Sequence, residues 1–328
     1  MTGSELRRDP TRDEWVLVAP GREVRPQEIA GDPVPGAGAC PFCPGREEYT
    51  PVESLRLPAE GPWHVRVVGN RYPLVAEGGK APTPVGYPFG IAAGWGRHDV
   101  LVESRDHFWD LRSATPDEVS LVFELAHRRY RMLVTDEPGA IMVFRNHGAA
   151  SGTSLEHPHS QMLSLAVPTP RLTRRWRIAE EHYRQHGMSI ADTVLAAELD
   201  DGRRILSEDQ LCVAFVPFAP STPFEVWILP RWPEKDFLAS TDASRAAAAA
   251  ALGAMATALD VVLDDPAYNM VLATGPPTMG RRQEWFRWHI KILPRITRRG
   301  GLELGTGLDV TTRLPEDCAA LLRAALPT

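Results

Sequence analysis

Residues 146–161 read Asn-His-Gly-Ala-Ala-Ser-Gly-Thr-Ser-Leu-Glu-His-Pro-His-Ser-Gln and directly follow the apolar run 140–144. A loop of small residues at the end of a strand lets the backbone approach a ligand closely, and Gly148 and Gly152 permit conformations that other residues resist. An imidazole beside such a loop can serve as a nucleophile or as a metal ligand. The stretch therefore indicates chemistry at a phosphate group.

The two histidines of this stretch are separated by one proline. If residues 157–161 are extended, His157, His159 and Gln161 point to one face, because strand side chains alternate. Pro158 cannot donate to a strand ladder and marks an edge or an irregularity. The two histidines can then divide their work, one binding a metal and one binding substrate. The alternative is that both are structural histidines, but the flanking small residues and Gln161 favour function.

Length and composition describe an ordinary globular protein. The 328 residues exceed one average domain, so we expect two domains or one duplicated domain. With 43% hydrophobic residues and a net charge of -6, general nucleic-acid binding is not expected. We find no apolar run of about 18 residues and no signal-peptide pattern, which predicts a cytoplasmic protein without a membrane partner.

All but three of the 36 basic residues are arginines. Codon bias in a GC-rich genome explains this, as the many alanines, prolines and glycines also suggest. The other interpretation is that some arginines bind phosphates bidentately. The candidates for such a role are Arg25, Arg281, Arg282 and Arg287, and the sequence does not separate the two interpretations.

Two of the four cysteines form the motif Cys40-Pro41-Phe42-Cys43. Cys-x-x-Cys is either a redox pair or half of a zinc site. The Pro-Gly turn after Cys43 favours a zinc knuckle over the strand–helix setting of a redox pair. Zinc needs four ligands, and ten histidines do not by themselves identify the other two. Cys212 and Cys318 lie in apolar surroundings and are expected to be buried.

Periodicity predicts the same order of elements twice. Both halves read strand–strand–helix–strand–strand, without the alternation of a parallel sheet, which indicates an α+β fold of two related halves. We expect strands at 15–19, 64–68, 99–103, 140–144, 161–165, 211–218, 224–229, 269–274 and 285–293. We expect helices at 117–133, 174–186, 244–262 and 315–326, the first and third capped at Thr115 and Thr241.

An ordered set of motifs resembles the galactose-1-phosphate uridylyltransferases of the histidine-triad superfamily. The similarity spans nearly the whole chain and rests on residues 8–26, 40–43, 68–73, 106–107, 146–161, 216–230 and 288–291. The resemblance implies two histidine-triad-like halves, each a mostly antiparallel sheet with packed helices. Residues 1–170 would carry a zinc site and the catalytic motif, and residues 171–328 would form the second half. It also implies a homodimer.

The resemblance implies a role for particular residues. His159 would attack the α-phosphorus of a nucleoside diphosphate sugar, and the nucleotidyl-histidine would pass its nucleotide to a second phosphate in a ping-pong course. Gln161 and Ser154 would hydrogen-bond the phosphoryl oxygens. The implied substrate-binding residues are Arg25, Asn70, Asn146, Gly152 and Ser160. The implied ligands of a structural zinc ion are Cys40, Cys43, His107 and His157.

Two departures from the family pattern bear on function. Uridylyltransferases carry glycine where this chain has Ser160, and serine is more similar to ADP-glucose:phosphate adenylyltransferases. The second half has only His289 where many relatives have His-x-His, which argues against a second metal site. If such a site exists, Glu181 and His289 are the ligands that remain for it. Despite the serine, the family pattern as a whole leads us to expect uridylyl transfer between a nucleotide sugar and a sugar 1-phosphate. The alternatives are adenylyl transfer to phosphate, a nucleotide-sugar hydrolase and a non-catalytic binding module.

Overall fold

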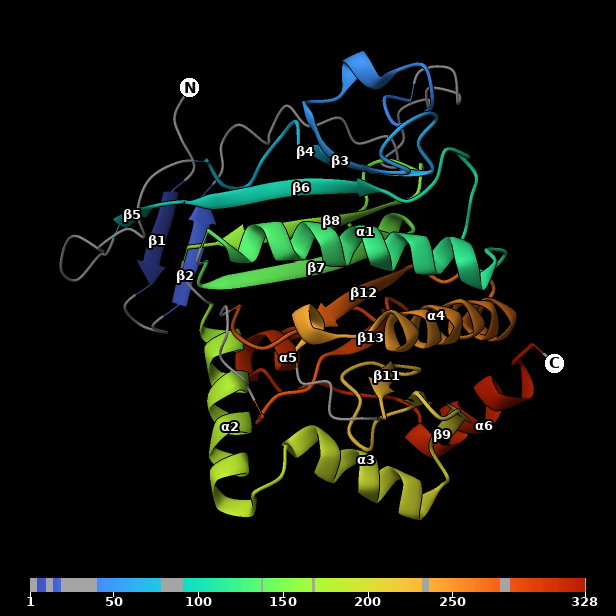
Figure 1. Cartoon of the computed structure of the whole chain (residues 1–328). Helices are drawn as coiled ribbons and strands as arrows, with labels where there is room; N and C mark the ends of the chain where they lie inside the picture. The colour runs from blue at the N-terminus through green and yellow to red at the C-terminus, as the bar shows by residue number, and fades with distance from the viewer. Residues whose placement is uncertain are drawn as a thin grey trace.

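One antiparallel sheet of ten strands organises the molecule (Figure 1). The computed structural model describes residues 5–9, 14–18, 40–77, 91–136, 138–166, 169–231, 236–277 and 284–327. The strand order is β3-β4-β6-β8-β7-β12-β13-β11-β10-β9. The strands are β3 (Glu53–Leu57), β4 (Val65–Gly69), β6 (Gly96–Val102), β7 (Ala140–His147), β8 (His159–Leu165), β9 (Ile205–Glu208), β10 (Cys212–Phe215), β11 (Val226–Pro230), β12 (Tyr268–Ala273) and β13 (His289–Pro294).

A second sheet and the helices complete the fold. Its strands β1 (Glu5–Asp9), β2 (Glu14–Val18) and β5 (Ile91–Ala93) pair in the order β2-β1-β5. The helices are α1 (Pro116–Val134), α2 (Pro170–His186), α3 (Ile190–Asp201), α4 (Asp242–Leu263), α5 (Gly301–Thr306) and α6 (Pro315–Ala324). Short 3-10 turns lie at η4 (Glu47–Tyr49), η5 (Ala149–Ser151) and η6 (Phe237–Ala239).

The two halves of the large sheet have the same topology. In the first half the chain runs β3, β4, β6, α1, β7, β8 and builds the spatial order β3-β4-β6-β8-β7. In the second half it runs β9, β10, β11, α4, β12, β13 and builds β9-β10-β11-β13-β12. The halves join through the antiparallel pair β7–β12. Strand β8 of the first half therefore corresponds to β13 of the second.

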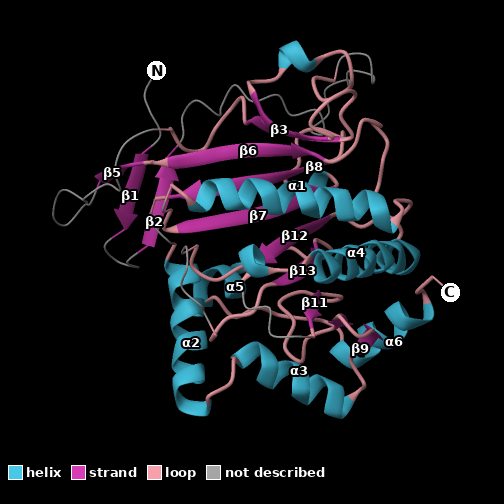
Figure 2. Cartoon of the chain, viewed as in Figure 1, coloured by secondary structure: helices cyan, strands magenta, loops and turns pink. Residues whose placement is uncertain are grey.

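Helices α1 and α4 cover one face of the sheet and pack side by side (Figure 2). Thr115 begins α1 with a capping box closed by Glu118, and Pro116 stands in the first turn, where its missing N–H costs nothing. Thr241 caps α4 in the same way through its side chain. The helix α4 is apolar and long enough to cross a membrane by length and composition alone, yet many of its residues are buried in the core.

Helices α2 and α3 lie away from this helical layer (Figure 1). The α2 helix ends at Gly187, which adopts a left-handed φ of 68°. Leu195 of α3 packs in a cluster with Val213, Phe215 and Leu229, whose side chains lie on the face opposite α4. Trp176 of α2 donates a hydrogen bond to the Thr274 carbonyl at the end of β12. The second half is thus covered on both faces.

Most predicted elements are confirmed, and the α+β class with them. The two predicted sheets are in fact one, because β7 and β12 pair. Several boundaries were wrong. Among them, β13 begins at His289, β10 spans only Cys212–Phe215, β8 begins at His159 and α2 begins at Pro170. The prediction also missed β1, β3, β5, β9, α3 and α5. The division into domains at 170/171 stays a prediction.

Two glycines of the loop after β7 offer a matched test. Gly148 has φ 75° and ψ 155°, a region that essentially only glycine adopts, and an added Cβ would lie 2.8 Å from the Ala267 side chain. Gly152 has φ 88°, but nothing lies within 4 Å of its added Cβ.

We expect Gly152→Ala to lower the free energy of unfolding by about 1 kcal/mol, from the left-handed conformation alone. Gly148→Ala should lower it by about 3 kcal/mol, since conformational strain and a backbone clash add. Urea unfolding of both variants measures the difference. Equal losses would show that contact with Ala267 does not constrain the loop.

Candidate active site

Strand β8 presents its odd-numbered residues on the face opposite α1. His159 pairs with Val102 of β6, and Gln161 pairs with Val100. Val100 and Val102 pack in a small cluster with Cys40, Phe42, Trp63 and Val68 on this face. The knuckle that holds the two cysteines therefore lies against the same face as His159. We call this the site face.

A backbone carbonyl fixes the tautomer of His159. Its Nδ1 lies 2.8 Å from the carbonyl oxygen of His157, which can only accept a hydrogen bond. Nδ1 therefore carries the proton, and Nε2 carries the lone pair that a nucleophile needs. The Phe42 ring lies 5.5 Å from the imidazole, and only 7% of His159 is exposed. The histidine is oriented and largely shielded from water.

Four side chains converge beside His159: Cys40, Cys43, His107 and His157. The Nε2 of His157 lies 2.9 Å from the Ser104 carbonyl oxygen and donates to it, which leaves the lone pair on Nδ1. This Nδ1 lies 3.4 Å from the Nδ1 of His107 and 3.6 Å from the Sγ of Cys43. Three donor atoms therefore face one point from different segments.

The spacing of these atoms fits a tetrahedral metal. Bond lengths of about 2.3 Å to sulfur and 2.05 Å to nitrogen place neighbouring S and N ligands about 3.5 Å apart and two N ligands about 3.3 Å apart. The observed separation of Cys43 Sγ from His107 Nδ1 is 3.4 Å, and that between the two imidazole nitrogens is 3.4 Å. The Cys2His2 group can bind a metal ion.

Burial sets the protonation of this group. It lowers the pKa of His157 to about 4, since a charged imidazole loses its hydration, so His157 is neutral as a ligand must be. Burial likewise raises the pKa of Cys40 to about 12, aided by the neighbouring Cys43. A dication among these ligands would offset the cost of burying thiolates. Arg66 helps to hold the knuckle by donating to the Pro41 carbonyl.

His98 orients Gln161 through a second fixed tautomer. The Leu74 N–H donates to His98 Nδ1 at 3.1 Å, so the proton of His98 lies on Nε2. Nε2 lies 2.9 Å from Gln161 Oε1 and donates to it. The amide oxygen of Gln161 is thereby occupied, and its NH2 group is the end available for an anionic ligand. Asn70 lies beside this histidine, with its Nδ2 atom 3.3 Å from His98 Nε2.

The second half of the chain contributes to the loop after β7. Asn269 of β12 donates from Nδ2 to Asn146 Oδ1 at 2.8 Å and to the Ser151 carbonyl at 3.0 Å. With its oxygen engaged, the Asn146 amide presents its NH2 group, as Gln161 does. Gly152 ends η5 in a left-handed conformation, and Ser154 is buried two residues later. A residue of the second half thus holds the loop of the first half, across the β7–β12 pair.

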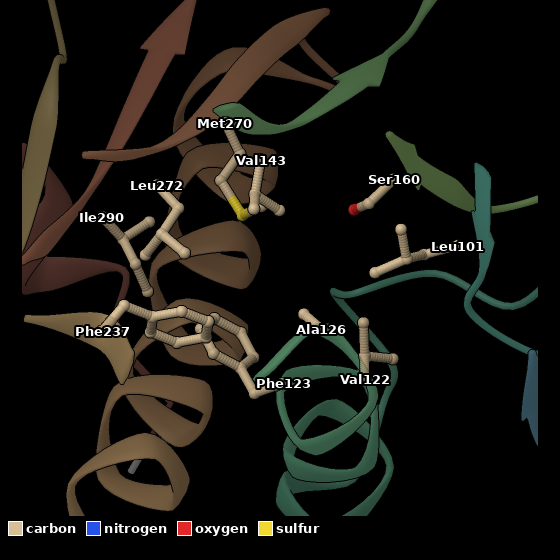
Figure 3. A pocket seen from close by; sticks show the side chains of 10 residues that line it. All are labelled: Leu101, Val122, Phe123, Ala126, Val143, Ser160, Phe237, Met270, Leu272 and Ile290. Carbon is tan, nitrogen blue, oxygen red and sulfur yellow. The ribbon is translucent and has the colours of Figure 1, made fainter. Parts of the chain in front are cut away.

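Ser160 points away from the site face. Its hydroxyl donates to Glu103, whose other oxygen accepts from Arg145 Nε at 2.9 Å. Figure 3 shows the hydroxyl directed into a small apolar cavity between the sheet and α1. The Glu103 N–H also donates to the Pro158 carbonyl at 3.1 Å. Glu103 therefore anchors the turn between His157 and His159 from behind, and the structure does not bring Ser160 together with His159 and Gln161.

The family is decided by comparison with known proteins. The profile for galactose-1-phosphate uridyl transferase, N-terminal domain, matches residues 1–169. ADP-glucose phosphorylase of Arabidopsis thaliana is 30% identical over 97% of this chain and 92% of the relative. The chain belongs to the galactose-1-phosphate uridyl transferase family. It is accordingly a nucleotidyltransferase.

Other members of the galactose-1-phosphate uridyl transferase family are similar over the full length. Galactose-1-phosphate uridylyltransferase of Thermotoga maritima is 26% identical over 97% of this chain and 98% of the relative. A solved uridylyltransferase, 29% identical, superposes with a TM-score of 0.83 over 98% of both chains. ADP-glucose phosphorylase from Arabidopsis thaliana with bound ADP-glucose, 28% identical, gives 0.76 over 100% of both chains. These similarities confirm the expected family and fold.

The residues considered as ligands of a second metal have other partners. Glu181 is half-buried and pairs with Arg184 and Gln185 on its own helix. Among the described residues, the Cys2His2 group is the one cluster with metal-ligand spacing. Arg287, considered as a phosphate ligand, is buried and bonds Asp192 and the Pro230 carbonyl. Arg25, Arg281 and Arg282 lie outside the described residues.

Sequence reasoning missed His98, Glu103 and Asn269. Each stands in or beside a predicted strand, where a polar side chain is commonly a solvated one. For His98 the available signal was its alternation with Val100 and Val102, which places a histidine on the face of the catalytic strand. Glu103 and Asn269 carried no such signal, because their partners are far away in sequence.

We expect His98→Leu to lower the rate of nucleotidyl transfer ten- to a hundredfold, since a Gln161 amide that can flip presents its donor only part of the time. The loss should appear in kcat, and Gln161→Ala should add nothing further to it. Steady-state kinetics of both single variants and the double variant form the cycle. Additive losses would show that His98 does not act through Gln161.

Proposed function

We propose that this nucleotidyltransferase moves a nucleoside monophosphate from a nucleoside diphosphate hexose to a phosphate acceptor through His159. The observation that carries the proposal is the fixed tautomer of His159, whose Nδ1 donates to the His157 carbonyl. The remaining lone pair on Nε2 is nucleophilic at neutral pH. The donor groups of Gln161 and Asn146 lie on the same face of the sheet, where anionic oxygens need stabilisation.

The reaction proceeds in two steps, first to His159 and then from His159 to the acceptor. His159 Nε2 forms a bond to the α-phosphorus, and the bond from that phosphorus to the bridging oxygen breaks, releasing the hexose 1-phosphate. An oxygen of the acceptor phosphate then attacks the same phosphorus and the N–P bond breaks, which restores the imidazole. Gln161, oriented by His98, hydrogen-bonds the phosphoryl oxygens as charge builds on them. Ser154, Gly152, Asn70 and Arg25 complete the proposed substrate site.

For the donor we propose ADP-glucose, with inorganic phosphate as acceptor. The support is the 30% identity to an ADP-glucose phosphorylase over nearly the whole chain, a higher identity than that of the 26% uridylyltransferase relative. This reverses the order that the sequence alone favoured. Uridylyl transfer to a hexose 1-phosphate, as in galactose metabolism, is the second candidate, supported by the TM-score of 0.83 to a uridylyltransferase.

For the metal we propose structural zinc. Two thiolates and two neutral imidazoles form the ligand set that zinc prefers in closed sites, and the spacing of the donor atoms supports it. The peptide from His157 to His159 links this cluster to the nucleophile, so the ion holds the site in shape. We further propose a cytoplasmic homodimer that binds neither nucleic acid nor membrane, in keeping with the net charge of -6.

The first test is intact-protein mass spectrometry after mixing the enzyme with one donor and no acceptor. We expect an adduct of one adenosine monophosphate from ADP-glucose, absent in His159→Ala and retained in His289→Ala, the corresponding histidine of the second half. An adduct from UDP-glucose instead would establish the second candidate.

Released hexose phosphate without any adduct would indicate hydrolysis of the nucleotidyl-histidine by water. An adduct that survives in His159→Ala would refute the assignment of the nucleophile. Neither adduct nor released hexose phosphate from any of ADP-glucose, UDP-glucose, UDP-galactose and GDP-mannose would overturn the proposed reaction.

The metal is tested by removing one ligand. Cys40→Ser should abolish stoichiometric zinc and lower the melting temperature, because binding free energy of a structural metal is part of folding free energy. Cys318→Ala is the matched control, since this cysteine is fully buried but remote from the cluster, and it should keep its zinc. Elemental analysis and thermal melts measure both. A Cys40→Ser variant with full zinc content would refute the site.

A further inference from the structure

The second half carries a modified copy of the catalytic strand. His289 opens β13 as His159 opens β8, and its Nδ1 lies 3.0 Å from the carbonyl oxygen two residues earlier, that of Arg287. The position of Gln161, two residues after the histidine, is taken by Lys291. The strands that the two histidines begin, β8 and β13, hold the same place in the topology of the two halves. The second half has therefore kept the histidine and its contact with a backbone carbonyl, but it has a cation in place of the amide of Gln161.

The copied histidine is not accessible as a nucleophile. It stacks on Trp227 with ring centres 5.0 Å apart and on Phe286 at 6.1 Å. Its Nε2 is buried without a hydrogen-bond partner. Burial and the nearby Lys291 lower its pKa to about 3, so it stays neutral. Any function of this region lies in the residues around the histidine.

A cleft of about 770 Å³ opens over this strand, between β13 and α2. Six basic residues line it, against the carboxylates of Glu225 and Asp309: Arg171, Arg174, Arg175, Lys291, Arg295 and Arg299. Such a volume suits a small-molecule ligand. The lining is strongly cationic although the whole chain is acidic.

Most of this charge is not neutralised by the protein. Arg299 pairs with Asp309 at 2.6 Å. Glu225 accepts from the Ser221 hydroxyl and the Trp227 indole N–H, and its charge balances part of that of Arg175 and Lys291. Within the described residues, no ion pair joins a carboxylate to Arg171, Arg174, Arg175 or Arg295. An anion would supply the missing countercharge.

Lys291 stands at the centre of this arrangement. Its Nζ lies 3.7 Å from the centre of the Trp227 ring, which fixes the ammonium group over the aromatic face. Burial, with Arg175 nearby, lowers the pKa of Lys291 to about 8. A half-buried cation beside further cations is costly, and a bound anion would remove that cost. The lysine on β13 and the arginines on α2 line the same cleft.

We propose that this cleft is a second ligand site, which binds the phosphate dianion of inorganic phosphate or of a small phosphate monoester. Several guanidinium groups and one ammonium group converge there, and arginine binds phosphate oxygens bidentately. The site binds its ligand without chemistry, because the histidine beneath it is enclosed. The inference stands independently of the reaction proposed at His159.

The test is calorimetric titration of the full-length enzyme with sodium phosphate in low-chloride buffer. Phosphate is also the acceptor proposed at His159, so only the binding that is lost in Arg174→Ala is assigned to the cleft. Arg174→Ala and Lys291→Met should each weaken the phosphate binding of this site at least tenfold. Arg177→Ala is the matched control: it removes the same charge from the same exposed helix without lining the cleft, and its binding should equal that of the native enzyme. Arg174 is exposed, so its variant keeps the test valid if Lys291→Met does not fold.

Absence of phosphate binding, or equal binding in the native enzyme, Arg174→Ala and Lys291→Met, would overturn the proposal. Weakening by Arg177→Ala to the same extent would also overturn it, by showing an effect of net charge rather than of the cleft. A second titration, with glucose 1-phosphate, distinguishes the source by the component of binding that Arg174→Ala removes. Tighter binding of glucose 1-phosphate than of phosphate identifies a monoester, and tighter binding of phosphate identifies the free ion.

Discussion

A single peptide, from His157 to His159, connects the two parts of the site. The carbonyl of His157 fixes the tautomer of His159, the proposed nucleophile, while the His157 imidazole joins the Cys2His2 group. Behind the sheet, Glu103 accepts from Ser160 and donates its N–H to Pro158, so the same turn is held from the opposite face. The position of the His159 imidazole therefore depends both on the Cys2His2 group and on a buried carboxylate.

Two amide side chains on the site face are oriented in the same way. In each, a neighbouring side chain donates to the amide oxygen, which leaves the NH2 group of the amide available to a ligand. His98 does this for Gln161, and Asn269 does it for Asn146. Preorganised donors cost no rearrangement when charge develops on a phosphoryl group, which is the largest single source of catalysis in such reactions. The supporting residues come from β6 and β12, on either side of the catalytic pair of strands.

The sequence predicted those features that depend on local chemistry. Caps such as Thr115 and Thr241 are local signals, and both helices begin where they indicate. The four metal-ligating residues, identified through the family resemblance, do converge. Strand alternation already places Ser160 on the face opposite His159 and Gln161, whereas the family resemblance implied that it binds substrate. The α3 helix could not be predicted, since its apolar residues show little helical periodicity.

The pairing of β7 with β12 limits how the molecule can be divided. A fragment that ended near residue 170 would leave β7 as a bare edge strand, with its ladder groups open to another chain, and such edges promote aggregation. The fragment would also lack Asn269, which holds the loop beside the nucleophile. Each half thus acts as a folding partner of the other, and neither is an independent catalytic module.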